Sequence, residues 1–245
     1  MLKSEDRRKN NMEEFEKQIK YLPIYGAVTY FFGYLVLSSR LAYLKIFIKD
    51  FFALDYLKTG LLFLFITIPI VLICIESMKS KYWILRFLLS VIFGAGLIFF
   101  LTPIIFVDRS DSTILTDFLT FAFYPLEVFI FVLLSKKYLT NFKKYDAFNS
   151  TITICLLLVM LTSFGNFIFP QIKFRFGGGA PYSKILYTLD EKGIENEINA
   201  RIFYENETWI HYKSENKTII SLPKKRIIKE KSLTEESSLN WYFNQ

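Results

Sequence analysis

Long uncharged apolar segments alternate with short charged ones in the first 172 residues, and the remaining sequence has none. Four segments carry no charged side chain, and a fifth, 118–135, carries only Glu127. The four are Tyr21–Ser39, Thr59–Ile75, Phe87–Val107 and Ala147–Ile172. Because a helix rises about 1.5 Å per residue, about 20 apolar residues cross a hydrocarbon core of roughly 30 Å. The pattern predicts a membrane α-helical bundle of about five transmembrane helices.

Charged residues separate this bundle from what precedes it. Residues 1–20 form a charged N-terminal segment, and residues 21–172 form the transmembrane domain. We expect the first apolar segment to stay in the membrane, because it is longer than the apolar part of a signal peptide and no small-residue cleavage site follows. The predicted spans are about 22–39, 60–75, 83–107, 118–135 and 151–169.

Residues 41–57, between the first two spans, mix large apolar side chains with charged ones. They are too charged to cross the bilayer and too apolar for a free loop. An interfacial amphipathic helix lying in the headgroup plane fits both properties. A continuation of the first span beyond the bilayer is the alternative.

Two glycines of the first span, Gly26 and Gly33, lie seven residues apart and share one face of the predicted helix. Small residues two turns apart let a second helix approach closely in a membrane. We therefore expect close helix packing on this face.

After Pro170 the pattern changes from long apolar segments to short β-strands. Runs rich in Ile, Tyr, Phe, Thr and Trp are bounded by turn-forming residues, which is typical of a small antiparallel meander. The predicted strands are 184–189, 200–205, 208–213 and 218–222, and residues 224–232 are the candidate for a fifth. This small β-rich soluble domain, 184–245, has few core residues, so we expect it to lean on the membrane domain or on a partner.

A glycine-rich segment, 173–183, links the two domains and contains Gly177, Gly178, Gly179 and Pro181. Consecutive glycines permit positive φ angles and close backbone approach, so we predict a hinge or a tight turn. A phosphate-binding loop would need G-x-x-x-x-G-K-[ST] leading into a helix. That pattern is absent from the sequence, and a predicted strand follows.

Three short motifs mark the region around this link: Pro170-x-Ile172, Gly177-Gly178-Gly179-x-Pro181, and Leu222-Pro223-Lys224 at the end of the β pattern. Together they resemble a group of uncharacterised bacterial multi-pass membrane proteins that place P-x-I and G-G-G-x-P just after the last span. The resemblance covers about residues 170–228. It implies the same architecture, and the group has no assigned activity.

The formal net charge of +7 belongs to the membrane part. Residues 1–175 carry 20 Lys and Arg against 13 Asp and Glu, whereas residues 176–245 carry 10 of each. A nucleic-acid-binding domain would be expected to show a basic stripe, so we expect no nucleic acid partner. The basic run Lys224, Lys225 and Arg226 is a candidate contact for lipid headgroups or for an acidic protein partner, and a solvated strand end is the alternative.

The loop charges also predict an orientation. Thirteen Lys and Arg flank the spans on the side of the N-terminus, against seven on the other side. Positive charges concentrate on the cytoplasmic side, so we expect a cytoplasmic N-terminus. Five spans then place the C-terminal domain outside the cytoplasm, on the plasma (inner) membrane of a bacterium.

Few residues are suited to catalysis or metal binding. Both cysteines, Cys74 and Cys155, lie inside apolar segments, and the single histidine, His211, lies in a predicted strand. A Ser–His arrangement would have to recruit His211 from a hairpin, and the sequence has no HExxH or Cys/His cluster. We therefore expect no enzymatic activity, no cofactor and no metal.

Glu127 is the one ionisable residue near the middle of a span, two positions after Pro125. A charged carboxylate at that depth is costly, so we expect it to be protonated, paired or facing a water-filled cavity. One hypothesis is a proton or cation relay. The other is a structural hydrogen bond between helices, to a tyrosine such as Tyr30 or Tyr34.

These features favour an integral membrane protein that acts as a membrane-anchored binding, sensing or docking module. The lipid bilayer is one predicted partner, and a protein that adds a strand to the C-terminal β domain is another. The alternative is a small transporter or channel subunit that uses Glu127.

Overall fold

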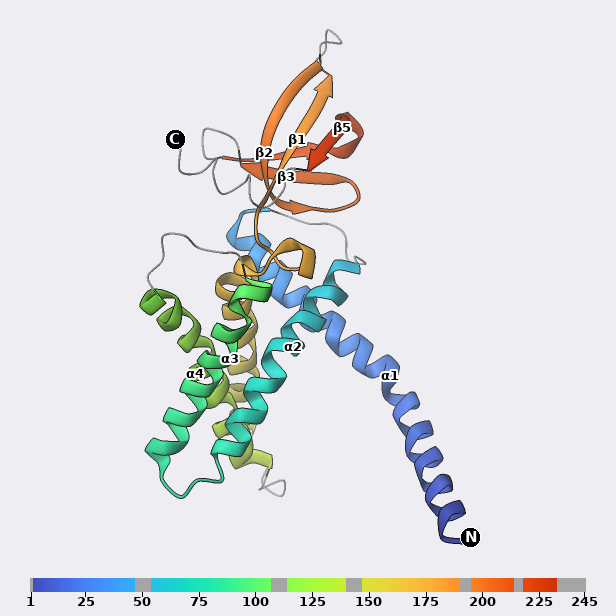
Figure 1. Ribbon diagram of the computed structural model, residues 1–245, viewed down its shortest axis with the longest axis vertical. Helices are drawn as coiled ribbons and strands as arrows, with labels where there is room; N and C mark the ends of the chain where they lie inside the picture. Colours follow the sequence, from blue (N-terminus) through green and yellow to red (C-terminus); the bar gives the residue numbers. More distant parts are fainter. Residues whose placement is uncertain are drawn as a thin grey trace.

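The computed structural model describes residues 2–46, 54–106, 114–139, 147–189, 195–213 and 218–232. Five α-helices come first, and a five-stranded antiparallel sheet follows them (Figure 1). The helices are α1 (Leu2–Tyr43), α2 (Leu54–Ser77), α3 (Trp83–Ile105), α4 (Ile114–Leu139) and α5 (Ala147–Ser163). The predicted fold class, a helical bundle with a small C-terminal antiparallel β domain, is confirmed.

Four of the helices are long and apolar enough to cross a membrane. These segments are Lys20–Tyr43, Leu54–Ser77, Trp83–Thr102 and Ser150–Gln171. The remaining predicted span, 118–135, corresponds to a shorter apolar helix at Ala122–Ser135, counted over the residues that the structure describes. By length and composition, therefore, the chain is a membrane protein.

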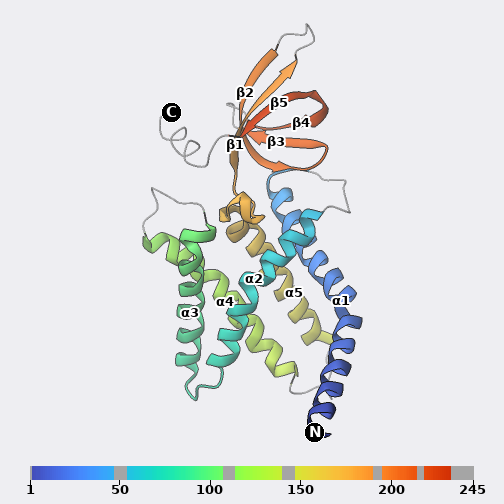
Figure 2. The same ribbon diagram turned by 45° about the vertical axis from the view of Figure 1, so that its right-hand side comes forward.

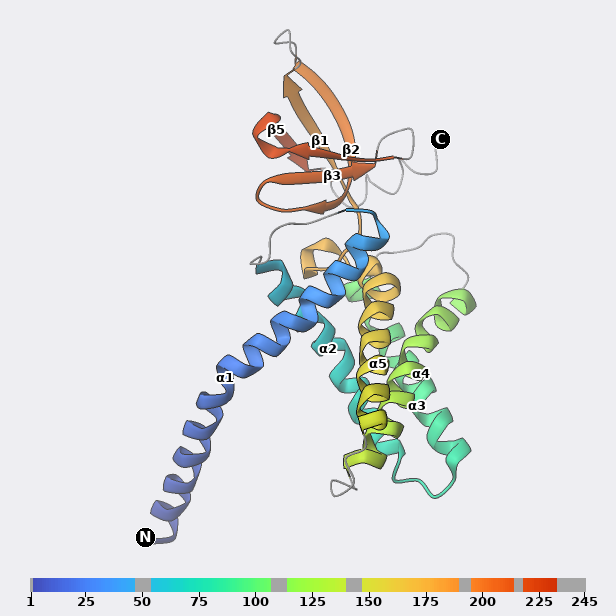
Figure 3. The same cartoon turned by 180° about the vertical axis from the view of Figure 1, so that it is seen from behind.

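Successive helices run in opposite directions along the bundle (Figure 2). α1 ends and α2 begins beside the sheet, while the α2–α3 connection lies at the far end of the bundle. The N-terminal half of α1 leaves the bundle, and its C-terminal half packs beside α2 and α5 (Figure 3). This alternation places the N-terminus and the β domain at opposite ends of the helices.

The backbones of α1 and α2 touch at two glycines. A Cβ atom added to Gly33 would lie 1.7 Å from the carbonyl oxygen of Tyr56, and one added to Gly60 would lie 1.9 Å from that of Thr29. Any larger residue would force the helices apart. The predicted close packing is therefore found at Gly33, whereas a Cβ on Gly26 would meet nothing within 4 Å.

A third glycine lets α1 approach the helix that leads to the sheet. Gly165 lies just beyond α5, and its added Cβ would be 2.6 Å from the carbonyl oxygen of Val36. Below this contact, the ring of Phe63 meets the ring of Phe164 edge to face at 5.2 Å. Both phenylalanines are fully buried, and Val36, Leu37 and Leu41 of α1 belong to the same buried cluster, so the C-terminal half of α1 is part of the core of the bundle.

The last apolar segment changes its helical geometry before it reaches the sheet. α5 is followed by a π-helical turn, η1 (Phe164–Ile168), and by two 3-10 turns, η2 (Phe169–Gln171) and η3 (Phe174–Phe176). A backbone hydrogen bond of 2.9 Å from Lys173 N to Ile105 O ties this segment to the end of α3. The link to the β domain is therefore anchored to the bundle on more than one helix.

The β domain is a five-stranded antiparallel sheet in the order β4-β3-β2-β1-β5. The first four strands form the meander expected from the sequence, and β5 joins β1 on its free side. The elements are β1 (Tyr182–Leu189), β2 (Glu195–Glu205), β3 (Trp209–Lys213), β4 (Ile219–Pro223), the 3-10 turn η4 (Lys224–Arg226) and β5 (Ile227–Ser232).

The short connection between β4 and β5 requires this sheet to curl. Strands lie about 4.8 Å apart, so the two edges of a flat five-stranded sheet would be separated by about 19 Å. The four residue steps from Pro223 to Ile227 reach at most about 14 Å. Because β4 and β5 are nevertheless the two edge strands, the edges must bend toward each other around the η4 end.

The sheet has a small core of its own and rests on the bundle. Its buried core residues are Leu186, Ala200, Ile202, Ile210 and Tyr212. Tyr204 of β2 belongs instead to the buried cluster of the helices, and Ile219 of β4 packs against that cluster. The expected leaning of the β domain on the membrane domain is thus seen in these two contacts.

The predicted interfacial helix at 41–57 lies partly outside the described residues, which omit 47–53. Its first residues end α1, which stops at Tyr43, and its last residues begin α2 at Leu54. Lys45 has a φ of 58°, a left-handed conformation that does not continue a right-handed helix. An interfacial helix over residues 47–53 stays a prediction.

The α1–α2 contact makes opposite predictions for two glycines of the same helix. Gly33→Ala should lower the thermal unfolding midpoint in detergent micelles, because overpacking of this kind costs about 1–3 kcal/mol. Gly26→Ala, the matched control, should leave the midpoint unchanged or raise it, because alanine favours helix over glycine by about 0.5–1 kcal/mol. Far-ultraviolet circular dichroism, which follows the helix content, measures both midpoints. Equal shifts of the two variants would contradict the close crossing.

Candidate functional site

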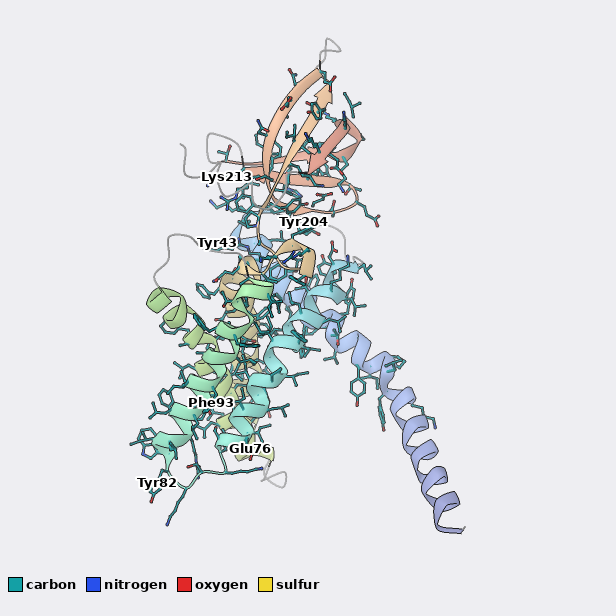
Figure 4. The ribbon with its side chains drawn as sticks, viewed as in Figure 1. Tyr43, Glu76, Tyr82, Phe93, Tyr204 and Lys213 are labelled. Carbon is teal, nitrogen blue, oxygen red and sulfur yellow. The ribbon has the colours of Figure 1, made fainter. Side chains whose placement is uncertain are left out.

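A cleft of about 410 Å³ lies between the sheet and the end of the bundle. Five segments line it: the end of α1, the start of α2, Phe169 of η2, the glycine-rich link and the end of β2. Figure 4 shows Tyr204 of β2 and Tyr43 of α1 near this junction. The lining residues are Leu37, Arg40, Leu41, Asp55, Lys58, Thr59, Phe169, Phe174–Ala180 and Phe203–Glu205. Both domains therefore build one site.

Three cations reach this cleft from three separate segments: Arg40 from α1, Lys58 from α2 and Arg175 from the link. Two carboxylates, Asp55 and Glu205, line it as well. Asp55 Oδ1 lies 3.5 Å from Lys58 Nζ, and both side chains are exposed. An exposed pair of this kind contributes little to stability, so it leaves the lysine free to meet a ligand.

Arg40 is half-buried at the end of α1. Its guanidinium carbon lies 5.6 Å from the centre of the Tyr43 ring. Its Nε is buried, and the described part of the chain offers that atom no hydrogen-bond acceptor. A buried donor without an acceptor costs about 1–3 kcal/mol, which a ligand oxygen in the cleft would recover.

The glycine-rich link is a close-packed turn. Gly177 has a φ of 80°, which favours glycine. A Cβ added to Gly178 would lie 2.2 Å from the carbonyl oxygen of Ile172, and one added to Gly179 would lie 2.4 Å from the Phe169 ring. The structure thus shows the tight turn, one of the two predicted alternatives, and motion about it as a hinge stays a prediction.

The amide groups of this turn are used within the turn itself. Gly177 N donates to Phe174 O at 2.8 Å, and Gly178 N donates to Lys173 O at 3.3 Å. Gly179 N donates to Phe169 O at 2.9 Å. These amides are therefore not presented to a ligand, and recognition in the cleft falls to side chains. Pro181 is half-buried and leads directly into β1.

Glu205 is the centre of an ion cluster that joins three strands and η4. Its Oε2 lies 2.8 Å from Lys184 Nζ and accepts a hydrogen bond from the Tyr182 hydroxyl, and its Oε1 lies 2.7 Å from Lys224 Nζ. Lys184 also lies 3.1 Å from Glu230 on β5. The side chains of Lys184 and Glu205 are only 10% and 14% exposed. The cluster therefore holds β5 and η4 against the middle of the sheet.

The cluster shifts the pKa values of its members. Burial alone would raise the pKa of the Glu205 carboxyl, but hydrogen bonds from Lys184, Lys224 and Tyr182 lower it to about 2. Burial opposes the charge of Lys184, yet its hydrogen bond to Glu205 raises the pKa of the ammonium. Burial and the Glu205 carboxylate both raise the pKa of Tyr182. At neutral pH, Glu205 is ionised and neutralised by its lysines.

The three residues of the predicted basic contact, 224–226, have different surroundings in the structure. Lys224 turns inward to Glu205, and its backbone N donates to Thr208 O at 2.9 Å. Lys225 and Arg226 are exposed in η4. Contact of these two with headgroups or with a partner stays a prediction.

Sequence patterns did not single out Arg40, Lys58, Arg175 or Glu205. The only signal for the three cations is their position within a few residues of predicted span ends, which any interfacial charge shares. No local signal marks Glu205, because its partners lie 19 and 21 residues away in the chain.

Glu127 on α4 meets α5 inside the bundle. Ser163 Oγ donates to Glu127 Oε1 at 2.8 Å. Glu127 Oε2 is buried, and it has no hydrogen-bond partner within the described residues. The expected tyrosines, Tyr30 and Tyr34, instead show edge contacts with the ring of Tyr56, at 5.5 and 5.3 Å between centroids.

Further polar groups lie close to Glu127 along the same helices. One turn earlier on α4, the Tyr124 hydroxyl lies 2.6 Å from Thr67 Oγ1 of α2. Ser163 directly precedes η1, and π-helical turns occur often at functional sites. Glu127 therefore forms a hydrogen bond between α4 and α5, but its partner is Ser163 and not the predicted tyrosine; its role as a relay stays a prediction.

His211 pairs with a serine on the neighbouring strand. Its Nδ1 lies 2.8 Å from Ser221 Oγ, and its ring stacks on Tyr204 at 5.9 Å between centroids. Burial lowers the pKa of the imidazole. Because His211 and Ser221 are register partners of β3 and β4, this is an ordinary cross-strand contact.

Metal-binding and thiol chemistry find little support in the described residues. There, no group of three or more His, Cys, Asp and Glu side chains is placed to hold a metal ion. Cys74 is buried and Cys155 is exposed, and both are free thiols. The cleft and the Glu127 pair are therefore the two candidate sites that the geometry supports.

Comparisons with protein-family models, with curated proteins and with solved structures find no match to this chain. The fold and the cleft define a class by themselves: a helical membrane protein with a small β domain resting on one end of its bundle. The resemblance of residues 170–228 to bacterial multi-pass proteins stays a prediction.

The ion cluster can be tested through Glu205. Glu205→Gln should destabilise the β domain by about 1–3 kcal/mol, because Lys184 and Lys224 lose the carboxylate that they share. Hydrogen–deuterium exchange of β1 and β2 peptides in the full chain measures this as faster exchange. Glu207→Gln, which removes an exposed carboxylate from the β2–β3 turn, is the matched control and should leave exchange unchanged.

The same cluster predicts the pH dependence. The pKa of Glu205 in the folded protein, about 2, lies below its ordinary value of 4.5. Its contribution to stability is therefore complete above about pH 4.5 and is lost as the pH falls toward about 2. The Glu205→Gln variant should lack this acid-dependent loss when the thermal unfolding midpoint is measured as a function of pH. The same pH dependence in the wild type and the variant would contradict the assignment.

Proposed function

We propose that this protein is a multi-pass membrane protein that acts as a binding module, in which the helices anchor a β domain and both parts hold a ligand at the membrane surface. One observation carries this proposal: the cleft of about 410 Å³ has walls from α1, α2, the link and β2. Clefts of about 300–1,000 Å³ are typical of small-molecule sites, which often lie where two domains meet.

The packing of the sheet supports a binding site that communicates with the helices. Tyr204 lines the cleft and also belongs to the buried cluster of the bundle. Its neighbour Glu205 lines the cleft and holds the ion cluster of the β domain. A ligand in the cleft would therefore contact residues that fix the sheet to the bundle.

The proposed site lies outside the cytoplasm of a bacterium, at the plasma membrane. Two observations support this orientation. Lys and Arg are more numerous on the side of the N-terminus, and the alternating helices put the β domain at the opposite end (Figure 3).

A protein partner of the β domain would use an edge strand. β4 and β5 are the two edges. Lys229 and Lys231 are exposed on β5, and such lysines discourage added strands, so β4 is the better edge for strand addition. No catalytic role is proposed.

Photo-crosslinking tests the binding proposal directly. A photoreactive amino acid at Phe203, in the cleft, should yield a defined adduct when the full chain is irradiated in native membranes. The same amino acid at Ile228, exposed on the β5 edge, is the control and should not yield that adduct. Mass spectrometry identifies the adduct, and equal yields at both positions, or none, would overturn the proposal.

A second function, a small transporter or channel subunit, is favoured by one observation. The buried Glu127 Oε2 has no hydrogen-bond partner within the described residues. The residue that binds the other oxygen, Ser163, directly precedes the π-helical turn η1. Ionisable groups at this depth often mark proton or ion paths.

Glu127→Gln separates the two functions. Glutamine keeps the shape and can still accept the hydrogen bond from Ser163, but it cannot take up or release a proton. The binding proposal predicts an unchanged thermal midpoint and an unchanged adduct at Phe203. Ser163→Ala should behave in the same way in the crosslinking assay. If Glu127→Gln folds normally but abolishes a proton or cation flux measured in proteoliposomes, the transporter function replaces the binding module.

A further inference from the structure

We infer that the cleft binds the phosphate of an anionic phospholipid headgroup, held by Arg40, Arg175 and Lys58. This inference rests on the proposed binding function and names the chemistry of its ligand.

The charge balance of the cleft points to an anion. Of the two carboxylates in its lining, Glu205 is already neutralised by Lys184 and Lys224. Asp55 offsets only Lys58, through an exposed contact of 3.5 Å. In the described part of the chain, neither Arg40 nor Arg175 forms an ion pair with a carboxylate. Two guanidinium groups are thus left for a ligand.

The two arginines suit phosphate in particular. A guanidinium group donates two parallel hydrogen bonds to phosphate oxygens, which gives both strength and orientation. Arg40 Nε is buried without an acceptor within the described residues, so an incoming oxygen would satisfy it. Each guanidinium also lies near an aromatic ring: Arg40 is 5.6 Å from Tyr43, and Arg175 is 4.9 Å from Phe176.

The depth of the cleft favours a lipid as the source of that phosphate. Arg40 lies three residues before the end of the apolar helix Lys20–Tyr43, and Lys58 lies in the first turns of Leu54–Ser77. Exposed aromatic residues mark the membrane interface in many proteins. Tyr43 is 71% exposed at this end of the bundle, and Trp83 is 72% exposed at the other end.

The lining of the cleft matches an amphiphile. Leu37 and Leu41 of α1 contribute apolar lining to the cleft, and Phe174 and Phe176 add exposed aromatic rings. A headgroup phosphate would meet the arginines while the first acyl carbons contact the exposed rings of Phe174 and Phe176. The volume of about 410 Å³ leaves room for more than a bare phosphate ion.

Native mass spectrometry of the full chain tests this inference. The protein, freed of lipid in detergent, is titrated with a short-chain phosphatidylglycerol and, separately, with the matching phosphatidylcholine. We expect tight one-to-one binding of phosphatidylglycerol only. Arg175→Gln and Arg40→Gln should each weaken it about tenfold, the loss of one charge-assisted pair. Lys231→Gln, an exposed lysine on β5, is the control and should bind as the wild type does.

Further variants and a competition experiment distinguish a lipid phosphate from a soluble phosphate. Arg40→Lys keeps the positive charge but loses the two parallel N–H donors of the guanidinium group, so it should recover only part of the affinity. Arg175→Gln tests the site even if Arg40→Gln fails to fold. Displacement of the lipid by an equal concentration of inorganic phosphate would assign the site to a soluble phosphate and overturn the lipid source. Equal binding of phosphatidylcholine, or no effect of either arginine variant, would overturn the inference.

The photo-crosslink at Phe203 separates this inference from the function on which it rests. A phospholipid adduct supports both, and a peptide or uncharged adduct keeps the binding module while rejecting the headgroup. Absence of any adduct rejects both.

Discussion

The close contact of α1 with its neighbours is the constraint on which the junction depends. At Gly33 and Gly60, the backbones of α1 and α2 meet with no side chain between them, and Gly165 permits a similar approach to the helix after α5. Membrane helices lack a hydrophobic driving force for association, so packing of this kind contributes much of the adhesion. Because the crossing lies about two turns below Arg40, it fixes where that cation emerges between α2 and the sheet.

In the β domain, the ion cluster at Glu205 fixes the positions of the strands around the cleft. A sheet with so small a core gains little from apolar burial, and its β4–β5 connection must also hold a bend. Lys184 and Lys224 bring the middle of the sheet and η4 to one carboxylate. Glu205 thereby stabilises the β domain and also lines the cleft. Because Lys184 and Lys224 neutralise its carboxylate, the unpaired charge among the described residues of the cleft comes from Arg40 and Arg175.

The sequence was sufficient for the elements and insufficient for the site. Spans and strands follow local periodicity, so both the long apolar helices and the meander were predictable, as was a turn at Gly177. The cleft depends on residues as distant as Arg40 and Glu205, whose proximity no local pattern encodes. Glu127 was recognisable because a carboxylate within an apolar span is rare, but its partner Ser163 lies 36 residues away and looks like any small polar residue of a span.

The depth of the cleft in a bilayer is the most direct test of a site built at the membrane surface. Electron paramagnetic resonance power saturation measures it for a spin label at Phe176, with Cys74 and Cys155 replaced by serine. Labels at Phe93, exposed on α3, and at Ile228, exposed on β5, serve as references for the hydrocarbon core and for water. We predict that the label at Phe176 lies at the level of the lipid phosphates, between the two references. A depth equal to that of Ile228 would place the cleft in bulk water and contradict a headgroup site.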